Sequence, residues 1–263
     1  MLSNLKKIQS YIDDEQYLNH PGKESDAYYS GNIDIEDCDV IATEIDNNGF
    51  TIIKVKNKSL LSIMRTLPKI LGKQIRDVGI NKKYIAKIKA STNGRFYINT
   101  SFSQPMHTDE GYRKVFPRYV SLYCVRPSLT GGISTLIKVK ELLSALYTRF
   151  GEEGVSNLFQ PSFIQIDTPS GLIDKQILFK VDENITGLSY SPILRDIKAT
   201  ALGYEIISFI NQFIHDASNQ YRVKLKEKDL LIMDNCRVLH GRTAFDGNDN
   251  RLLIRLWNDL VSL

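Results

Sequence analysis

The 263-residue chain contains four histidines, three cysteines and no long apolar run. No stretch is apolar enough to cross a bilayer, and the first twenty residues lack the apolar core of a signal peptide. We therefore expect a cytoplasmic protein with no membrane partner. An odd number of widely spaced cysteines does not suit a disulfide framework, so Cys38, Cys124 and Cys236 are expected to be buried, reduced thiols.

Positively charged residues are in small excess over negatively charged ones. Lys and Arg number 34 against 30 Asp and Glu, which gives a net charge of +4. This excess is too small to favour nucleic acid as a partner, although it suits an anionic small molecule. Internal repeats, low-complexity tracts and Pro/Gly/Ser-rich linkers are missing too. The sequence therefore predicts one domain over residues 1–263 with a helical N-terminal portion at about 1–48, and it leaves the oligomeric state open.

Alternating and β-branched residues predict strands at 49–55, 84–88, 119–125, 133–139, 163–166, 176–180, 221–233 and 251–257. Apolar residues at helical spacing predict helices at 59–78, with Pro68 interrupting it, and at 140–150 and 201–220. Many short strands with a few helices favour a mainly β fold with flanking helices, such as a sandwich or jelly roll. The turn-rich segment at about 161–198 is predicted to be a lid insert.

His107 and Asp109 lie two residues apart, so within a strand their side chains share a face and can meet one metal ion. Such a triplet is common and, by itself, is more often structural than functional. A third ligand must come from elsewhere, and His240 is the natural candidate. Two histidines and one carboxylate on one face of a metal leave the other positions open, which suits Fe(II) that must bind a co-substrate and dioxygen.

Two arginines, Arg251 and Arg255, follow His240 and share a face of one predicted strand. A guanidinium clamps a carboxylate with two parallel hydrogen bonds, and a buried arginine without an anion is costly. Arg251 beside an open metal site therefore suits a dicarboxylate co-substrate. The alternative for either arginine is an exposed salt bridge on an edge strand.

The other two histidines carry weaker signals. His215 lies on a predicted helix among polar residues and is expected at the surface. His20 precedes Pro21 in an N-terminal loop and is expected to be structural.

Together these motifs resemble the TauD/TfdA family of Fe(II)/2-oxoglutarate-dependent dioxygenases, which includes taurine dioxygenase-like and clavaminate synthase-like enzymes. The resemblance runs from about Gly49 to the C-terminus. It rests on His107-Thr108-Asp109 with Tyr112, Pro117 and the strand at 119–125, Gly131 to Leu136, Lys228 to Asn235, Arg237 to Phe245, and Arg251 with Arg255. It implies a double-stranded β-helix, which is a cupin-like jelly roll.

The resemblance also implies roles for single residues. His107, Asp109 and His240 are expected to ligate Fe(II). Because Asp109 is present, halogenation is not expected, since halogenases of the family replace this carboxylate with a small residue. Hydroxylation of an unactivated C–H bond is the default reaction, and desaturation, epoxidation and cyclisation remain open.

The same resemblance assigns an anion site. Arg251 is expected to bind the distal carboxylate of 2-oxoglutarate, and Thr135, after the Gly-Gly turn, is expected to help. The family motif has one residue between the glycines and the threonine, whereas this chain has two, so Ser134 is the alternative. Arg255 is expected to meet an anionic part of the substrate. A small carboxylate-bearing metabolite, such as an amino acid or derivative, is therefore the expected substrate.

Three other functions remain to be weighed. A non-catalytic binding module on the same fold would carry a damaged set of ligands, but this set is complete. A zinc hydrolase is disfavoured because no HExxH motif is present and Arg251 would have no role. A substrate tethered to a carrier or protein would need a docking surface that sequence cannot show.

Overall fold

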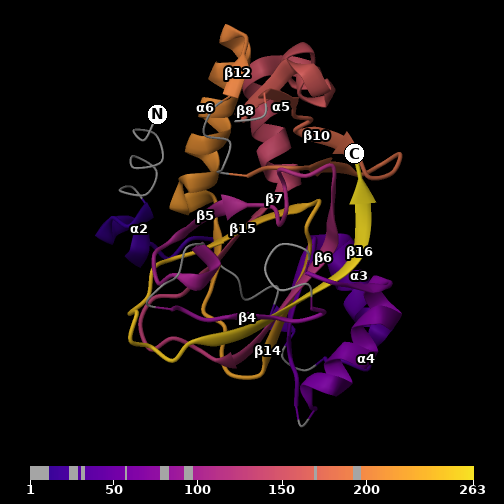
Figure 1. The fold of residues 1–263 in the computed structure, drawn as a ribbon, viewed down its shortest axis with the longest axis vertical. Coiled ribbons are helices and arrows are strands. Elements are labelled where there is room, and N and C mark those ends of the chain that lie inside the picture. The colour runs from indigo at the N-terminus through magenta and orange to yellow at the C-terminus, as the bar shows by residue number, and fades with distance from the viewer. Residues whose placement is uncertain are drawn as a thin grey trace.

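The computed structural model describes residues 12–23, 29–30, 33–56, 58–77, 83–91, 97–168, 171–191 and 197–263. Figure 1 shows strands in the middle of the molecule and helices on two outer sides. The strands form two principal sheets that share one apolar interior. This arrangement is the predicted jelly roll with flanking helices.

The larger sheet has the strand order β1-β2-β14-β6-β16-β3, and β4 also pairs with β16. Its long central strands pair antiparallel, and β16 runs beside β6 over most of its length. The strands are β1 (Tyr29–Ser30), β2 (Phe50–Lys54), β3 (Gln74–Ile75), β4 (Ala86–Ile88), β6 (Val115–Arg126), β14 (Asp229–Asp234) and β16 (Leu252–Ser262).

The smaller sheet is antiparallel and has the order β13-β7-β15-β5. Its strands are β5 (Gln104–His107), β7 (Ser134–Lys138), β13 (Tyr221–Val223) and β15 (Val238–Arg242). Residues on the inner face of both sheets are buried together, and the outer faces pack on helices. One face of each strand therefore points into the barrel and the other towards a helical layer.

Helices α3 (Cys38–Asn48) and α4 (Leu60–Leu71) cover the larger sheet. Helices α5 (Val139–Ser156) and α6 (Ala201–His215) cover the smaller sheet. The short helix α2 (Glu15–Asn19) packs through Tyr17, whose ring lies 4.4 Å from the Arg222 guanidinium. None of the helices in the described ranges is both long and apolar enough to span a bilayer.

The segment predicted as a lid insert forms two small sheets of its own. The first joins β12 (Ile197–Ala199), β8 (Ile164–Thr168) and β9 (Gly171–Asp174), and the second is the hairpin β10 (Leu178–Lys180) and β11 (Thr186–Leu188). Short 3-10 turns occur at η2 (Tyr97–Asn99), η3 (Asn157–Phe159), η4 (Pro161–Phe163) and η5 (Ala217–Asn219). All four residues of β9 are exposed, whereas β10 and β11 are mostly buried.

Several predicted boundaries differ from the observed ones. The helix predicted at 59–78 ends at Leu71 because Gly72 adopts a left-handed φ of 77°, while Pro68 is accommodated inside it. The strand predicted at 221–233 is two strands, β13 and β14, separated by a turn in which Lys228 has a φ of 67°. The helix predicted at 201–220 ends at His215. Local turn conformations, which hydrophobic periodicity does not report, set these limits.

His215 is buried, which corrects the expectation of a surface position. Its Nδ1 donates to the Asn211 carbonyl, and burial lowers its pKa to about 4. Burial also raises the pKa of Cys124 to about 11, as expected for an inert thiol. Cys38 is half-buried rather than buried, and all three cysteines are free.

Candidate metal and anion site

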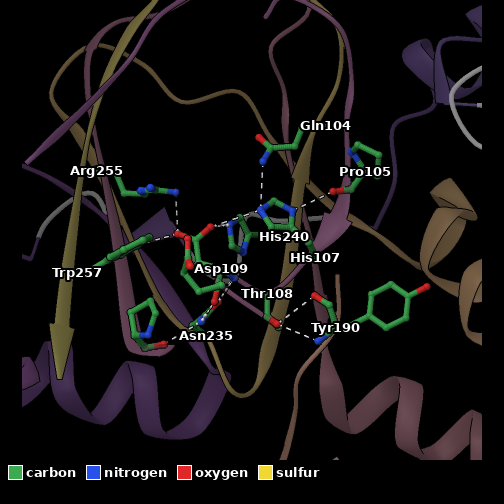
Figure 2. A network of polar contacts seen from close by, with 12 residues as sticks. Gln104, Pro105, His107, Thr108, Asp109, Tyr190, Asn235, His240, Arg255 and Trp257 are labelled. Carbon is green, nitrogen blue, oxygen red and sulfur yellow. Dashed lines mark hydrogen bonds and ion pairs between the residues drawn. The ribbon is translucent and has the colours of Figure 1, made fainter. Parts of the chain in front are cut away.

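His107 and His240 face each other across two neighbouring strands. They are register partners in the β5–β15 pair, and their ring centroids lie 4.4 Å apart. Asp109 lies in the turn that follows β5 rather than in the strand itself. The two-residue spacing therefore brings Asp109 to the histidines through a turn, not through strand alternation as predicted (Figure 2).

The three side chains form a compact donor set. Asp109 Oδ1 lies 3.4 Å from His107 Nε2 and 3.6 Å from His240 Nε2. All three ligand atoms fall within 4.8 Å of one another, and no second such group occurs in the described part of the chain. Two imidazole nitrogens and one carboxylate oxygen on one side of a point suit a divalent transition metal with open positions opposite.

Hydrogen bonds orient His107 for metal binding. Its Nδ1 lies 2.9 Å from the Pro105 carbonyl oxygen, which can only accept, so Nδ1 carries the proton. The lone pair therefore sits on Nε2, to which the Gln104 amide donates at 3.1 Å. His240 Nε2 points at the same carboxylate oxygen, while its buried Nδ1 has no hydrogen-bond partner.

The second oxygen of Asp109 is held by the protein. Oδ2 accepts from Arg255 Nη1 at 3.0 Å and from Trp257 Nε1 at 2.7 Å, which leaves Oδ1 turned towards the histidines. Burial opposes ionisation of Asp109, but the Arg255 charge and the histidine hydrogen bonds outweigh it and hold its pKa well below the usual range. The site thus offers an ionised carboxylate.

The backbone around Asp109 is fixed by Asn235, which follows β14. Asn235 Oδ1 accepts from the Asp109 amide at 2.7 Å, and its Nδ2 donates to the carbonyls of Asp109 and Pro117 at 3.1 and 2.8 Å.

Burial, followed by the nearby His107, lowers the pKa of His240. The histidine is therefore a neutral ligand near pH 7.

Arg251 is buried, and within the described ranges no hydrogen bond or ion pair joins it to another residue. Burial lowers its pKa to about 10. Two further cations, Arg242 and Lys224, lie near Arg251. The pKa of each is lowered first by burial and then by the charge of Arg251. Arg242 donates to the Phe102 carbonyl, and Lys224 donates to the Gly131 carbonyl and to the Ser128 hydroxyl. A buried Arg251 flanked by two further cations is a candidate site for an anionic ligand.

Ser134, rather than Thr135, lies on the same sheet face as His240. Thr135 Oγ1 contacts Met106 Sδ at 3.2 Å, and Met106 belongs to the apolar layer between the smaller sheet and its helices. Ser134 has the opposite orientation, since alternate residues of a strand point to opposite faces, and it pairs in register with Arg242. Of the two hydroxyls, that of Ser134 therefore lies on the sheet face that carries His240.

Arg255 sits between two carboxylates. Besides Asp109 it contacts Asp77, with Nη2 and Oδ2 2.6 Å apart, and its guanidinium lies 4.3 Å from the Trp257 ring. Its Nε is buried without a partner. Sequence reasoning missed Trp257 and Asp77. Trp257 shares a strand face with Arg255 and could have been found by the same two-residue spacing, whereas Asp77 lies in a loop and gives no such signal.

Comparison with known proteins shows similarity to one family over part of the chain. Residues 175–257 match the model described as "Taurine catabolism dioxygenase TauD, TfdA family". Clavaminate synthase 2 of Streptomyces clavuligerus is 27% identical over 183 residues, covering 60% of this chain and 52% of that protein. The 3-((Z)-2-isocyanoethenyl)-1H-indole synthase of Fischerella ambigua is 27% identical over 187 residues, covering 62% and 66%. The chain thus spans about half to two thirds of the length of these two relatives.

Solved structures share the fold at low sequence identity. Asparagine oxygenase in complex with Fe(II), 2S,3S-3-hydroxyasparagine and succinate superposes with a TM-score of 0.66 at 16% identity, covering 97% of this chain and 89% of that chain. The non-heme iron oxygenase OrfP in complex with Fe and alpha-ketoglutaric acid gives a TM-score of 0.65 at 15% identity, covering 85% and 78%. The predicted jelly-roll architecture is confirmed by these likenesses.

Proposed function

We propose that this chain, whose residues 175–257 match the TauD/TfdA family model, is an Fe(II)- and 2-oxoglutarate-dependent dioxygenase that oxidises a small molecule. The observation that carries the proposal is the pairing of two sites in one barrel. His107, Asp109 and His240 converge on one point, and the buried Arg251 lies immediately before β16, the strand whose Arg255 contacts Asp109.

The residues present fit Fe(II). An ionised carboxylate and two neutral imidazoles are the donor set of non-haem iron oxygenases, and the Pro105 carbonyl fixes the required tautomer of His107. When bound, Fe(II) together with 2-oxoglutarate and dioxygen supplies an oxidant strong enough to break an unactivated C–H bond. The protein orients the ligands and surrounds them with buried side chains.

We assign the anion site to 2-oxoglutarate. The Arg251 guanidinium offers two parallel donors to the distal carboxylate of 2-oxoglutarate. Ser134 offers a hydroxyl on the sheet face that carries His240. Arg242 and Lys224 lie near enough for the Arg251 charge to lower their pKa values, so they add positive potential at this site. A dicarboxylate would compensate the charge that the fold leaves unpaired.

The substrate is proposed to be a small carboxylate-bearing metabolite such as an amino acid or derivative. Support comes from the neighbouring structures, whose ligands are hydroxyasparagine and dihydroxyarginine. Arg255 Nε, which is buried without a partner, is the donor proposed to meet the substrate carboxylate. The segment at 161–198 is proposed to cover the substrate as a lid. Three free thiols suit a reducing compartment, so we propose a cytoplasmic enzyme.

Hydroxylation is the proposed reaction, and desaturation, epoxidation or cyclisation is the second candidate. The relatives named for clavaminate and for an isocyanoethenyl indole favour keeping this second candidate. The intact Asp109 carboxylate leaves halogenation out of the proposal. The mass change of the product separates the two candidates, since hydroxylation adds one oxygen and desaturation or ring closure removes two hydrogens.

Anaerobic titration with Fe(II) and 2-oxoglutarate, followed by turnover against an amino-acid panel, tests the proposal. We expect a visible metal-to-ligand charge-transfer band, then succinate formation that depends on the organic substrate. A protein that gives no such band is a binding module and not an oxygenase. A protein that gives the band but oxidises only carrier-bound amino acids would retain the cofactor chemistry and overturn the free-substrate assignment.

A further inference from the structure

Asp77 is a buried carboxylate that the proposed metal chemistry does not use directly. It follows β3, whose residue Ile75 pairs with Trp257 on β16, and only 4% of Asp77 is exposed. This register brings the loop after β3 alongside Arg255, so that Asp77 Oδ2 lies 2.6 Å from Arg255 Nη2. The pairing of β3 with β16 therefore sets the position of a charge beside the site.

Arg255 connects Asp77 to the metal ligand. Its Nη2 is taken by Asp77, and its Nη1 donates to Asp109 Oδ2 at 3.0 Å. The Trp257 indole lies beside the guanidinium and donates to the same Asp109 oxygen. One cation is thus shared between two carboxylates, and only one of those carboxylates faces the histidines.

We propose that Asp77 is a positioning residue of the metal centre, which acts through Arg255 to keep Asp109 Oδ1 available for the metal. An arginine beside a lone carboxylate favours a fork in which two nitrogens bind both oxygens. Asp77 occupies Nη2 and so prevents Arg255 from turning into that fork. Asp109 then keeps one oxygen on the protein and one on the metal.

Charge acts in the same direction. Asp77 shares the charge of Arg255 with Asp109 and so reduces the positive charge that a divalent cation at the site would face. Removing the Asp77 charge would let Arg255 compete for Asp109 Oδ1 and would also raise the electrostatic cost of binding the metal. Both effects predict weaker metal binding, and neither requires Asp77 to touch the metal or the substrate.

The inference rests on the proposed metal centre and is tested by metal binding rather than turnover. Anaerobic Fe(II) titrations of the full chain would compare wild type, D77N and D77E, with Co(II) absorption as a report on ligand geometry. Residues that orient metal ligands typically contribute about 10–100-fold in metal affinity. We expect D77N to weaken Fe(II) binding by about that factor and to change the Co(II) spectrum, and D77E to restore part of the affinity.

Asp229 supplies a matched control. It is a fully buried carboxylate of β14 that pairs with Lys54 at 3.2 Å, so D229N removes a buried charge outside the contacts of the site. D229N should change stability without changing the Co(II) spectrum. In an R255Q background, D77N should have no further effect on Fe(II) affinity, because Arg255 carries the effect.

Three results would overturn the inference while leaving the metal centre in place. D77N could bind Fe(II) as tightly as wild type with an unchanged Co(II) spectrum. It could raise only the KM for the organic substrate, which would make Asp77 a substrate contact. Its effect could persist fully in the R255Q background. If D77N does not fold, the D77E variant provides the test. Wild-type Fe(II) affinity and an unchanged Co(II) spectrum in D77E would contradict the proposal that the position of the Asp77 carboxylate matters. Failure of wild type to bind Fe(II) would instead contradict the proposed function.

Discussion

Arg251 and Asp109 are both buried charged residues of the proposed site, but their surroundings differ. A guanidinium inside a barrel loses its hydration, and none of the described carboxylates compensates it. Asp109, by contrast, is compensated by Arg255 and by its neighbours, so it remains ionised. The same residue type, arginine, therefore has two roles that differ only in what surrounds it.

Replacement of Arg251 by glutamine should raise the KM for 2-oxoglutarate strongly. Charge-assisted hydrogen bonds contribute about 1.5–3 kcal/mol, which corresponds to a loss of roughly 10–150-fold in affinity. The free energy of unfolding should not fall by a comparable amount, because no protein partner is left unpaired. Steady-state kinetics and urea unfolding of R251Q measure the two quantities, and a large loss of stability with unchanged KM would contradict the assignment.

The choice between Ser134 and Thr135 can be tested by a pair of variants. S134A removes the hydroxyl on the face of His240, and the loss of one neutral hydrogen bond, about 0.5–1.5 kcal/mol, should raise the KM for 2-oxoglutarate by about 2–10-fold. T135V removes the hydroxyl that contacts Met106 on the outer face and should leave this KM unchanged. A raised KM in T135V with an unchanged KM in S134A would instead assign the 2-oxoglutarate contact to Thr135.

At the scale of elements, the β5–β15 pair determines whether two histidines meet. Its register places His107 opposite His240, and β15 also pairs with β7. Gly241 lies next to His240, where an added Cβ would be 2.7 Å from the Gln104 carbonyl and 2.9 Å from Thr135 Oγ1. The close approach of these strands therefore depends on the absence of a side chain at one position.

G241A should separate β5 from β15 and weaken the metal site along with the fold. Overpacking of this kind costs about 1–3 kcal/mol, and the resulting shift should lower Fe(II) affinity because His107 moves relative to His240. Thermal unfolding and anaerobic Fe(II) titration measure the two effects. The control is G247A, where an added Cβ would approach only Ser101 Oγ at 3.2 Å. Equal Fe(II) affinity in both variants would contradict the role given to Gly241.

At the scale of the whole molecule, two buried bases make stability depend on pH. Burial lowers the pKa of Lys175 to about 7, and its ammonium has one hydrogen bond, to Ser189 Oγ. Burial lowers the pKa of His215 to about 4. In both cases the folded-state pKa lies below that of the unfolded chain, so the unfolded chain binds more protons between the two values. Stability should therefore rise with pH over those windows.

For Lys175 the window runs from about pH 7 to the usual lysine pKa of 10.5. One proton corresponds to at most about 1.4 kcal/mol per pH unit, so stability should rise between pH 7.5 and 9.5 in urea unfolding. K175M should reduce this rise and stabilise the protein most at the lower pH. The exposed Lys180 is the control, since K180M should leave the slope unchanged. An equal slope in wild type and K175M would show that Lys175 does not bind its proton as described.

The sequence determined the chemistry of the site and the kind of fold. The triplet at 107–109, the distant His240 and the two following arginines are local patterns, and the alternation of apolar residues specifies strands whatever their partners. The tertiary structure decided what depends on facing and register. It turned Ser134 inward and Thr135 outward, it buried His215, and it brought Asp77 to Arg255 through the pairing of β3 with β16. These contacts join residues distant in sequence, and periodicity along one segment carries no information about which strand lies beside it.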